Sequence, residues 1–129
     1  MIKALKVTMI VYAVLGILFG LAYILVPRQV GAMFGFEQGP SYVPYILAVL
    51  GVSFIAACVF LIAAARDPVK HIYWVKFALL FAVLMVVVIL YSVIQGYVSF
   101  GQAGMGIILH AIFAVALLVF YPWRAVRGG

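Results

Sequence analysis

The stretch WVKFALLFAVLMVVVILYSVI, residues 74–94, decides the fold, because Lys76 is the one charge among otherwise apolar or neutral side chains. An α-helix of about 20 apolar residues crosses a hydrocarbon core of about 30 Å. Three further apolar runs of similar length lie at residues 7–26, 45–65 and 105–121. Because lipid cannot satisfy backbone hydrogen-bonding groups, we predict an all-α integral membrane protein, an antiparallel bundle of four transmembrane helices.

The composition agrees with lipid as the main solvent of this 129-residue chain. Hydrophobic residues make up 71% and charged residues 8%, whereas soluble domains carry about 25% charged residues. These proportions exclude a soluble enzyme, a nucleic-acid-binding domain and a disordered tail. We expect a single transmembrane domain over residues 1–129, and the one cysteine, Cys58, excludes an intrachain disulfide.

Basic residues lie mainly on one side of the predicted membrane. Seven of the eight flank the N-terminus, the second loop or the C-terminus: Lys3, Lys6, Arg66, Lys70, Lys76, Arg124 and Arg127. The opposite side carries Arg28 and Glu37. Because cytoplasmic loops are enriched in lysine and arginine, we predict a multi-pass protein of the bacterial inner (cytoplasmic) membrane with both termini cytoplasmic.

The connections between the helices carry local signals. Asp67 can cap the third helix and Pro68 suits its first turn, so that helix is predicted over residues 69–95. Apolar residues at helical spacing within residues 28–36 predict a short interfacial helix, with an irregular apolar loop as the alternative. Residues 96–104 are glycine-rich and uncharged, which favours a loop that is mobile or held by a partner.

Gly16 and Gly20 form a G-x-x-x-G pattern in the first predicted helix. Two glycines one turn apart let another helix backbone approach closely. We therefore assign Gly16 and Gly20 as helix-packing residues. Their partner is either another helix of the same chain, a second copy, or a helix of another membrane subunit.

His110 is the most informative polar residue, because it lies well inside the fourth predicted helix. A histidine within the bilayer needs a partner and therefore faces the bundle interior. Neutral polar residues of the other helices lie at about its depth: Tyr23, Tyr45, Tyr91, Ser92 and Gln95. One hypothesis is a structural histidine that bridges the third and fourth helices.

Other hypotheses give His110 a functional role. A quinone, a lipid or a pigment can contact a site made of His110, Tyr23, Tyr45, Tyr91 and Gln95. A proton relay through the histidine is a further alternative. The cofactor prediction is accordingly limited to a bound lipid or quinone.

The sequence shows no residue set for catalysis or metal binding. His71 and His110 lie toward opposite sides of the membrane, which excludes a bis-histidine haem or a His/Cys zinc site within one chain. No carboxylate lies within any predicted span, and no nucleophile has a base beside it. We therefore expect no enzyme activity and no metal site.

Two stretches resemble a known family. They read LFGLAYILVP at residues 18–27, followed by FGF at 34–36, and GIILHAIFAVALLVFY at residues 106–121. They resemble small, largely uncharacterised bacterial four-helix membrane proteins, broadly of the DoxX type. DoxX-type proteins have been linked to quinone-related redox chemistry, so the resemblance implies the fold and topology more than an activity.

Two functional hypotheses follow. In the first, the protein is a non-catalytic accessory or structural subunit of a larger membrane complex, respiratory or photosynthetic, and contacts lipids and other membrane subunits. In the second, it is a free-standing membrane protein that binds a quinone, lipid or other apolar small molecule in the outer half of the bundle. Gentle detergent extraction followed by native size analysis distinguishes them.

Overall fold

A computed structural model of the chain describes residues 1–36 and 39–127. Every regular element in those residues is a helix: α1 (Ile2–Leu25), α2 (Pro27–Met33), α3 (Tyr42–Ala64), α4 (Ile72–Ile94), α5 (Phe100–Val119) and α6 (Trp123–Arg127). α1, α3, α4 and α5 are long and apolar enough to cross a membrane. The prediction of an all-α fold with four such helices is confirmed, and Glu37 lies outside the described residues.

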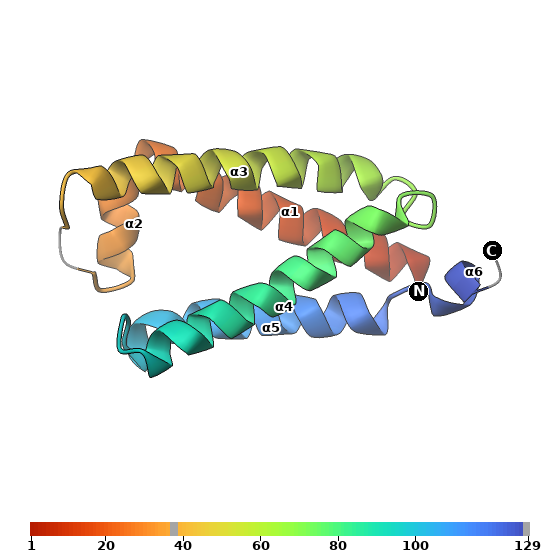
Figure 1. Cartoon of the computed structure of the whole chain (residues 1–129). Coiled ribbons are helices and arrows are strands. Elements are labelled where there is room, and N and C mark those ends of the chain that lie inside the picture. Colours follow the sequence, from red (N-terminus) through yellow and green to blue (C-terminus); the bar gives the residue numbers. More distant parts are fainter. Residues whose placement is uncertain (37–38, 128–129) are drawn as a thin grey trace.

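The four long helices are arranged as two antiparallel hairpins (Figure 1). α1 lies along α3 and α4 lies along α5, whereas contacts between the two hairpins are few. The hairpins meet near the chain termini and the α3–α4 connection, which we call the closed end (Figure 1). They separate toward α2 and the α4–α5 connection, which we call the open end (Figure 1).

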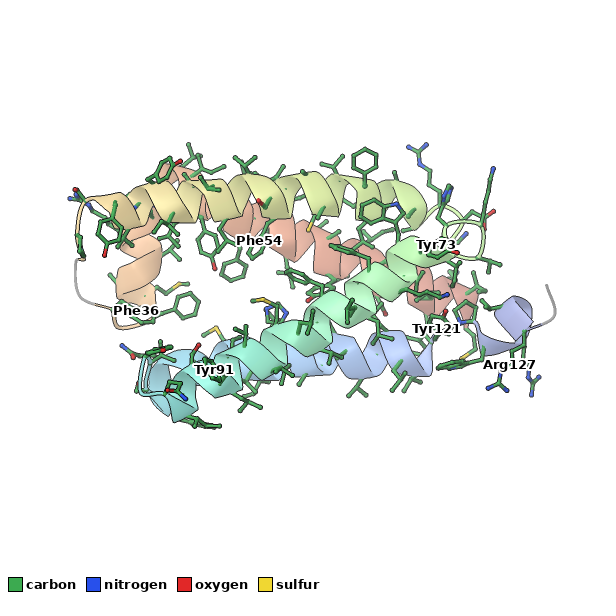
Figure 2. All side chains as sticks on the ribbon, viewed as in Figure 1. Phe36, Phe54, Tyr73, Tyr91, Tyr121 and Arg127 are labelled. Carbon is green, nitrogen blue, oxygen red and sulfur yellow. The ribbon has the colours of Figure 1, made fainter. Side chains whose placement is uncertain are left out.

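The buried core occupies the closed end, where Tyr121 lies (Figure 2). Leu5, Met9, Val75 and Leu117 have 0% of their surface exposed and come from α1, α4 and α5. Because lipid is as apolar as leucine, close van der Waals packing holds these helices together in a membrane. The core therefore joins the hairpins at one end and leaves the other end apart.

α1 and α3 cross with their backbones in contact at Gly20 and Gly51. A Cβ atom on Gly20 would lie 2.7 Å from the Gly51 carbonyl oxygen, and one on Gly51 would meet the Gly20 carbonyl oxygen. Gly16, one turn earlier, faces the Cys58 side chain. The glycine face of the first helix thus packs closely as predicted, and its partner is α3 of the same chain.

α5 begins at Phe100 rather than at residue 105, because Ser99 and Gln102 form a capping box. The Ser99 hydroxyl accepts a hydrogen bond from the Gln102 N–H (3.1 Å), and the Gln102 side-chain oxygen accepts one from the Ser99 N–H (2.9 Å). This exchange satisfies two donors that a helix start otherwise leaves unpaired. The loop predicted over residues 96–104 is therefore wrong from residue 100 onward.

α4 begins at Ile72 rather than at residue 69. The Asp67 carboxylate accepts a hydrogen bond from the Lys70 N–H (3.2 Å), and the Asp67 carbonyl accepts one from the His71 N–H (3.1 Å). Asp67 therefore caps a separate turn ahead of α4 instead of the first turn of the helix.

α1 and α3 begin earlier than the apolar runs that predicted them. α1 begins at Ile2 instead of residue 7, so Lys3 lies on its first turn, and α3 begins at Tyr42 instead of residue 45. A helix need not stop where the hydrocarbon core stops, because its polar first turns can lie among the headgroups. The C-terminal ends of the four long helices differ from the predictions by one or two residues, which is within the usual uncertainty of helix ends.

The short helix predicted over residues 28–36 is present as α2, which lies across the open end (Figure 1). It ends at Met33 rather than at residue 36, and the chain turns at Gly35, whose φ of +80° is the left-handed conformation that glycine tolerates best. The Phe36 N–H then donates to the Gly31 carbonyl (2.9 Å). Gln102 Nε2 of α5 donates to the Gly35 carbonyl (3.0 Å), so a hydrogen bond links the two hairpins across the open end.

Candidate binding site

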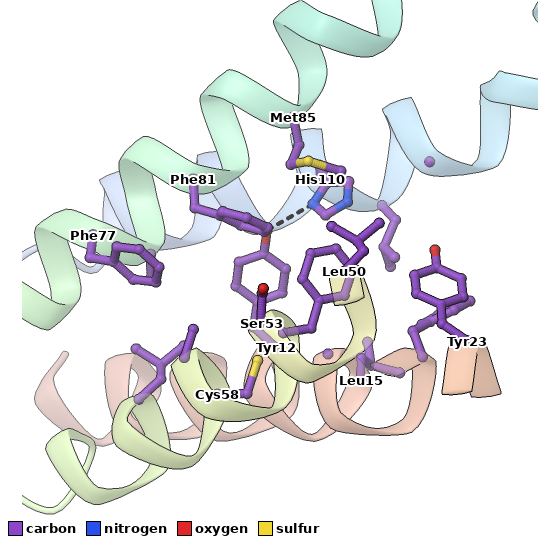
Figure 3. Close-up of a pocket in the computed structure, with 18 of the residues that line it drawn as sticks. Tyr12, Leu15, Tyr23, Leu50, Ser53, Cys58, Phe77, Phe81, Met85 and His110 are labelled. Atoms are coloured by element: carbon purple, nitrogen blue, oxygen red, sulfur yellow. Dashed lines mark hydrogen bonds between the residues drawn. The ribbon is translucent and has the colours of Figure 1, made fainter. Parts of the chain in front are cut away.

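An apolar cavity of about 350 Å³ lies between the two hairpins (Figure 3). All four long helices contribute to its wall, whose larger apolar side chains are Leu15, Phe19, Phe54, Phe77, Phe81 and Met85. Small-molecule sites typically have volumes of about 300–1,000 Å³ and mainly apolar walls. The cavity therefore has the size and the lining of a site for an apolar small molecule.

A tyrosine–histidine pair is the main polar feature of this cavity. The Tyr12 phenol oxygen on α1 lies 2.7 Å from Nδ1 of His110 on α5, a hydrogen bond between the two hairpins (Figure 3). The Tyr12 ring stacks on Phe113 of α5, with centroids 4.4 Å apart. His110 therefore points into the bundle as expected. The predicted bridge between the third and fourth helices is wrong, because the partner lies on the first helix.

The Tyr12–His110 pair contains one more donor than its own hydrogen bond uses. A neutral imidazole carries one N–H and a tyrosine carries one O–H, and the bond between them uses one of the two. When Tyr12 donates to Nδ1, the imidazole Nε2–H remains free; in the other tautomer the Tyr12 O–H remains free.

The free donor of the pair can be reached from the cavity. No fully buried side-chain nitrogen or oxygen in the described part of the chain lacks a hydrogen-bond partner. His110 bonds through Nδ1, and both His110 and Tyr12 line the cavity. When Tyr12 donates to Nδ1, the imidazole Nε2–H is therefore the donor that a molecule in the cavity would meet.

Of the residues expected around His110, the structure brings Tyr23 to the cavity wall. Tyr45 and Tyr91 are instead 71% and 52% exposed, and Gln95 is exposed beyond the end of α4. Tyr45 lies in the first turn of α3, Tyr91 in the last turn of α4, and Gln95 just after it, so all three lie near the open end. His110 lies near the middle of α5, so their predicted depth is wrong, and none of the three lines the cavity. Because α3 and α4 are apolar all round, no amphipathic period marks the face that points inward.

Tyr12 is the site residue that the sequence reasoning missed, although the sequence contains a signal for it. It lies near the middle of α1, far from the membrane interfaces where tyrosines usually gather. A buried tyrosine hydroxyl usually finds a hydrogen-bond partner. A tyrosine and a histidine that are both near mid-span are therefore a pair that depth alone suggests.

Two more polar side chains, Ser53 and Cys58 of α3, line the cavity. The Ser53 hydroxyl already donates to the Val49 carbonyl (3.0 Å). The Cys58 side chain is half-buried and faces Gly16 of α1. Because the lining carries no charged side chain, this cavity is suited to a neutral molecule and can orient it with one hydrogen bond.

Comparisons of the chain with protein families, curated proteins and solved structures found no match. The resemblance of residues 18–36 and 106–121 to DoxX-type proteins therefore stays a prediction. Within residues 1–36 and 39–127, no group of three or more His, Cys, Asp or Glu side chains could hold a metal ion. The geometry of the cavity and of the Tyr12–His110 pair is therefore the main indication of function.

Proposed function

We propose that this protein binds an apolar molecule carrying a hydrogen-bond acceptor in the cavity between its hairpins. The observation behind the proposal is the free donor of the Tyr12–His110 pair, set in a largely apolar wall. A carbonyl oxygen fits this donor, and quinones and ester lipids combine such a carbonyl with an apolar body. The proposed role is binding, without catalysis by the chain itself.

The unpaired donor favours a carbonyl-bearing molecule over a plain hydrocarbon. A buried polar group left without a partner costs about 1–3 kcal/mol. A carbonyl oxygen removes that cost, whereas a hydrocarbon of the same shape leaves it in place. The aromatic and aliphatic wall then supplies most of the contact, and the donor sets the orientation of the bound molecule.

We also propose that the closed end faces the cytoplasm of a bacterial cell. It carries both termini and the α3–α4 connection, around which seven of the eight basic residues lie. Arg28 lies on α2 at the open end. Because lysine and arginine are enriched on the cytoplasmic side, this orientation places the open end in the outer half of the inner membrane.

Cysteine labelling tests the orientation in a Cys58→Ala background. We expect Ser41→Cys, at the open end, to react with a membrane-impermeant maleimide in intact cells. Ala125→Cys, on α6, should react only after the cells are permeabilised. Both positions are exposed, so burial in the protein limits neither reaction. Labelling of Ala125→Cys but not of Ser41→Cys in intact cells would mean that the protein has the opposite orientation.

A second candidate function is that of a non-catalytic accessory subunit of a larger membrane complex. The observation that favours it is an exposed apolar stripe along α5, formed by Ile108, Ile112, Val115 and Val119. Their spacing of three and four residues places them on one face of the helix. A transmembrane helix of another subunit can pack on such a face.

Gentle extraction followed by native size analysis separates the two functions. If the chain binds an apolar molecule without other subunits, we expect a small particle that contains this chain alone, with a quinone or lipid extracted alongside it. Migration with a fixed set of larger subunits, and no small molecule bound to this chain, would favour the accessory subunit and contradict the binding proposal.

A further inference from the structure

A second cavity, of about 480 Å³, lies at the open end between α2 and the start of α3. Its apolar wall includes Val30, Phe34, Phe36, Val43 and Leu47. Tyr23 and Phe34 line this cavity as well as the one that contains His110. The two cavities are therefore neighbours that share Tyr23, whereas Arg28 lines only the second and the Tyr12–His110 pair only the first.

The polar side chains on the wall of the second cavity are Tyr23 and Arg28. A guanidinium group is always charged, offers several N–H donors and contains no acceptor, and a phenol also donates. The planar fork of an arginine matches the two oxygens of a phosphate or a carboxylate. The second cavity therefore combines an apolar wall with a cationic donor that favours an anionic acceptor.

Arg28 lies just beyond the end of α1, where the headgroups of the adjacent leaflet are expected. α1 ends at Leu25, and Arg28 is the second residue of α2, which crosses the open end (Figure 1). The hydrogen bonds from the Phe36 N–H to Gly31 and from Gln102 to Gly35 fix the segment that follows α2. The wall is thus held in place before any lipid arrives.

We propose that the second cavity binds an acidic phospholipid from the adjacent leaflet. Its headgroup phosphate pairs with Arg28, and one acyl chain lies against Val30, Phe34 and Leu47. Charge complementarity selects an acidic lipid, because the cation of a zwitterionic headgroup offsets the attraction of its phosphate for a guanidinium. The site is separate from the Tyr12–His110 pair and does not depend on the function proposed above.

A tryptophan at position 36 provides a local test, because Phe36 lines the second cavity and not the first. Phe36→Trp is made in a Trp74→Phe/Trp123→Phe background and reconstituted into phosphatidylcholine vesicles. One set of vesicles contains phosphatidylglycerol with brominated acyl chains, and a second set contains the same fraction of brominated phosphatidylcholine. Brominated chains quench tryptophan on contact. We expect phosphatidylglycerol to bind about fivefold more tightly, which corresponds to ~1 kcal/mol for one basic residue near acidic lipid.

Arg28→Gln should abolish this preference, and its side chain is exposed, so the fold should tolerate the change. Arg28→Lys should retain part of the preference, because it keeps the charge and loses the fork. Arg124→Gln at the closed end is the matched control and should leave the preference unchanged. Equal quenching by the two lipids, or a preference that survives Arg28→Gln, would overturn the proposal.

A second measurement covers the case in which the tryptophan replacements prevent folding. Native mass spectrometry of the chain with its own tryptophans then counts retained phosphatidylglycerol against retained phosphatidylcholine. We expect Arg28→Gln to lose one tightly held phosphatidylglycerol that Arg124→Gln keeps. Equal retention by both variants would overturn the proposal.

Discussion

Gly20→Ile is expected to lower the free energy of unfolding by about 3 kcal/mol, the upper end for overpacking a core. The new side chain would begin 2.7 Å from the Gly51 carbonyl oxygen and 2.9 Å from Cγ1 of Ile55. Because the carbonyl belongs to the backbone of α3, the two helices must separate and lose van der Waals contact. Unfolding in mixed detergent micelles, followed by circular dichroism, measures the loss.

Gly16 and Gly104 provide matched controls for the helix crossing. At Gly16 the obstacle is the Cys58 sulfur, which can rotate away, so Gly16→Ala should cost less than Gly20→Ala. A Cβ on Gly104 would lie 3.9 Å from the Phe100 ring, an ordinary contact. Gly104→Ala should therefore be neutral or slightly stabilising. Wild-type stability of Gly20→Ile would mean that α1 and α3 do not cross there.

The double variant Tyr12→Phe/His110→Leu is expected to fold with nearly wild-type stability and to bind a quinone about tenfold more weakly. Replacing both partners of a hydrogen bond by apolar groups of similar shape is nearly neutral for folding. Interhelical hydrogen bonds in membranes contribute only about 0.6 kcal/mol each on average. The bound carbonyl, by contrast, loses its donor, and about 1.4 kcal/mol corresponds to a tenfold change in affinity.

Thermal unfolding with and without decylubiquinone measures both effects. A ligand at about 100 times its dissociation constant stabilises the folded state by about 2.7 kcal/mol, and the double variant should gain less at the same concentration. Each single variant still offers one free donor, on Tyr12 or on His110, as the wild-type pair does, and should keep most of the gain. Tyr97→Phe, at a side chain that is 68% exposed, is the control. A wild-type gain in the double variant would contradict the proposed site.

The four long apolar helices are the part of this structure that the sequence predicts best. Hydropathy and length predict the four long helices, and the position of His110 within the fourth predicts that it points inward. Both predictions succeed because unpaired backbone or imidazole groups are costly inside the hydrocarbon core, whichever helices are their neighbours. The pattern Ser99-Phe-Gly-Gln102 also contains the capping signal that starts α5, although the glycines around it suggested a loop.

Helix rotation could not be predicted, and rotation decides which residues form the site. Tyr45 and Tyr91 are exposed near the open end, and α3 and α4 have no polar face that would have marked the outside in the sequence. The partner of His110 depends on how the two hairpins meet at the buried core, and the shape of the first hairpin depends on the contact between Gly20 and Gly51. Such a contact involves two helices at once, so the pattern of one helix does not specify it.

Native mass spectrometry of the wild-type chain, released from its own membrane, tests most directly whether the cavity holds an apolar molecule with a hydrogen-bond acceptor. We predict one bound molecule that dissociates on activation and is identified as a quinone or an ester lipid. Its occupancy should fall in Tyr12→Phe/His110→Leu and stay unchanged in Tyr97→Phe. A wild-type chain released with nothing bound, or equal occupancy in the wild type and the double variant, would contradict the proposed function.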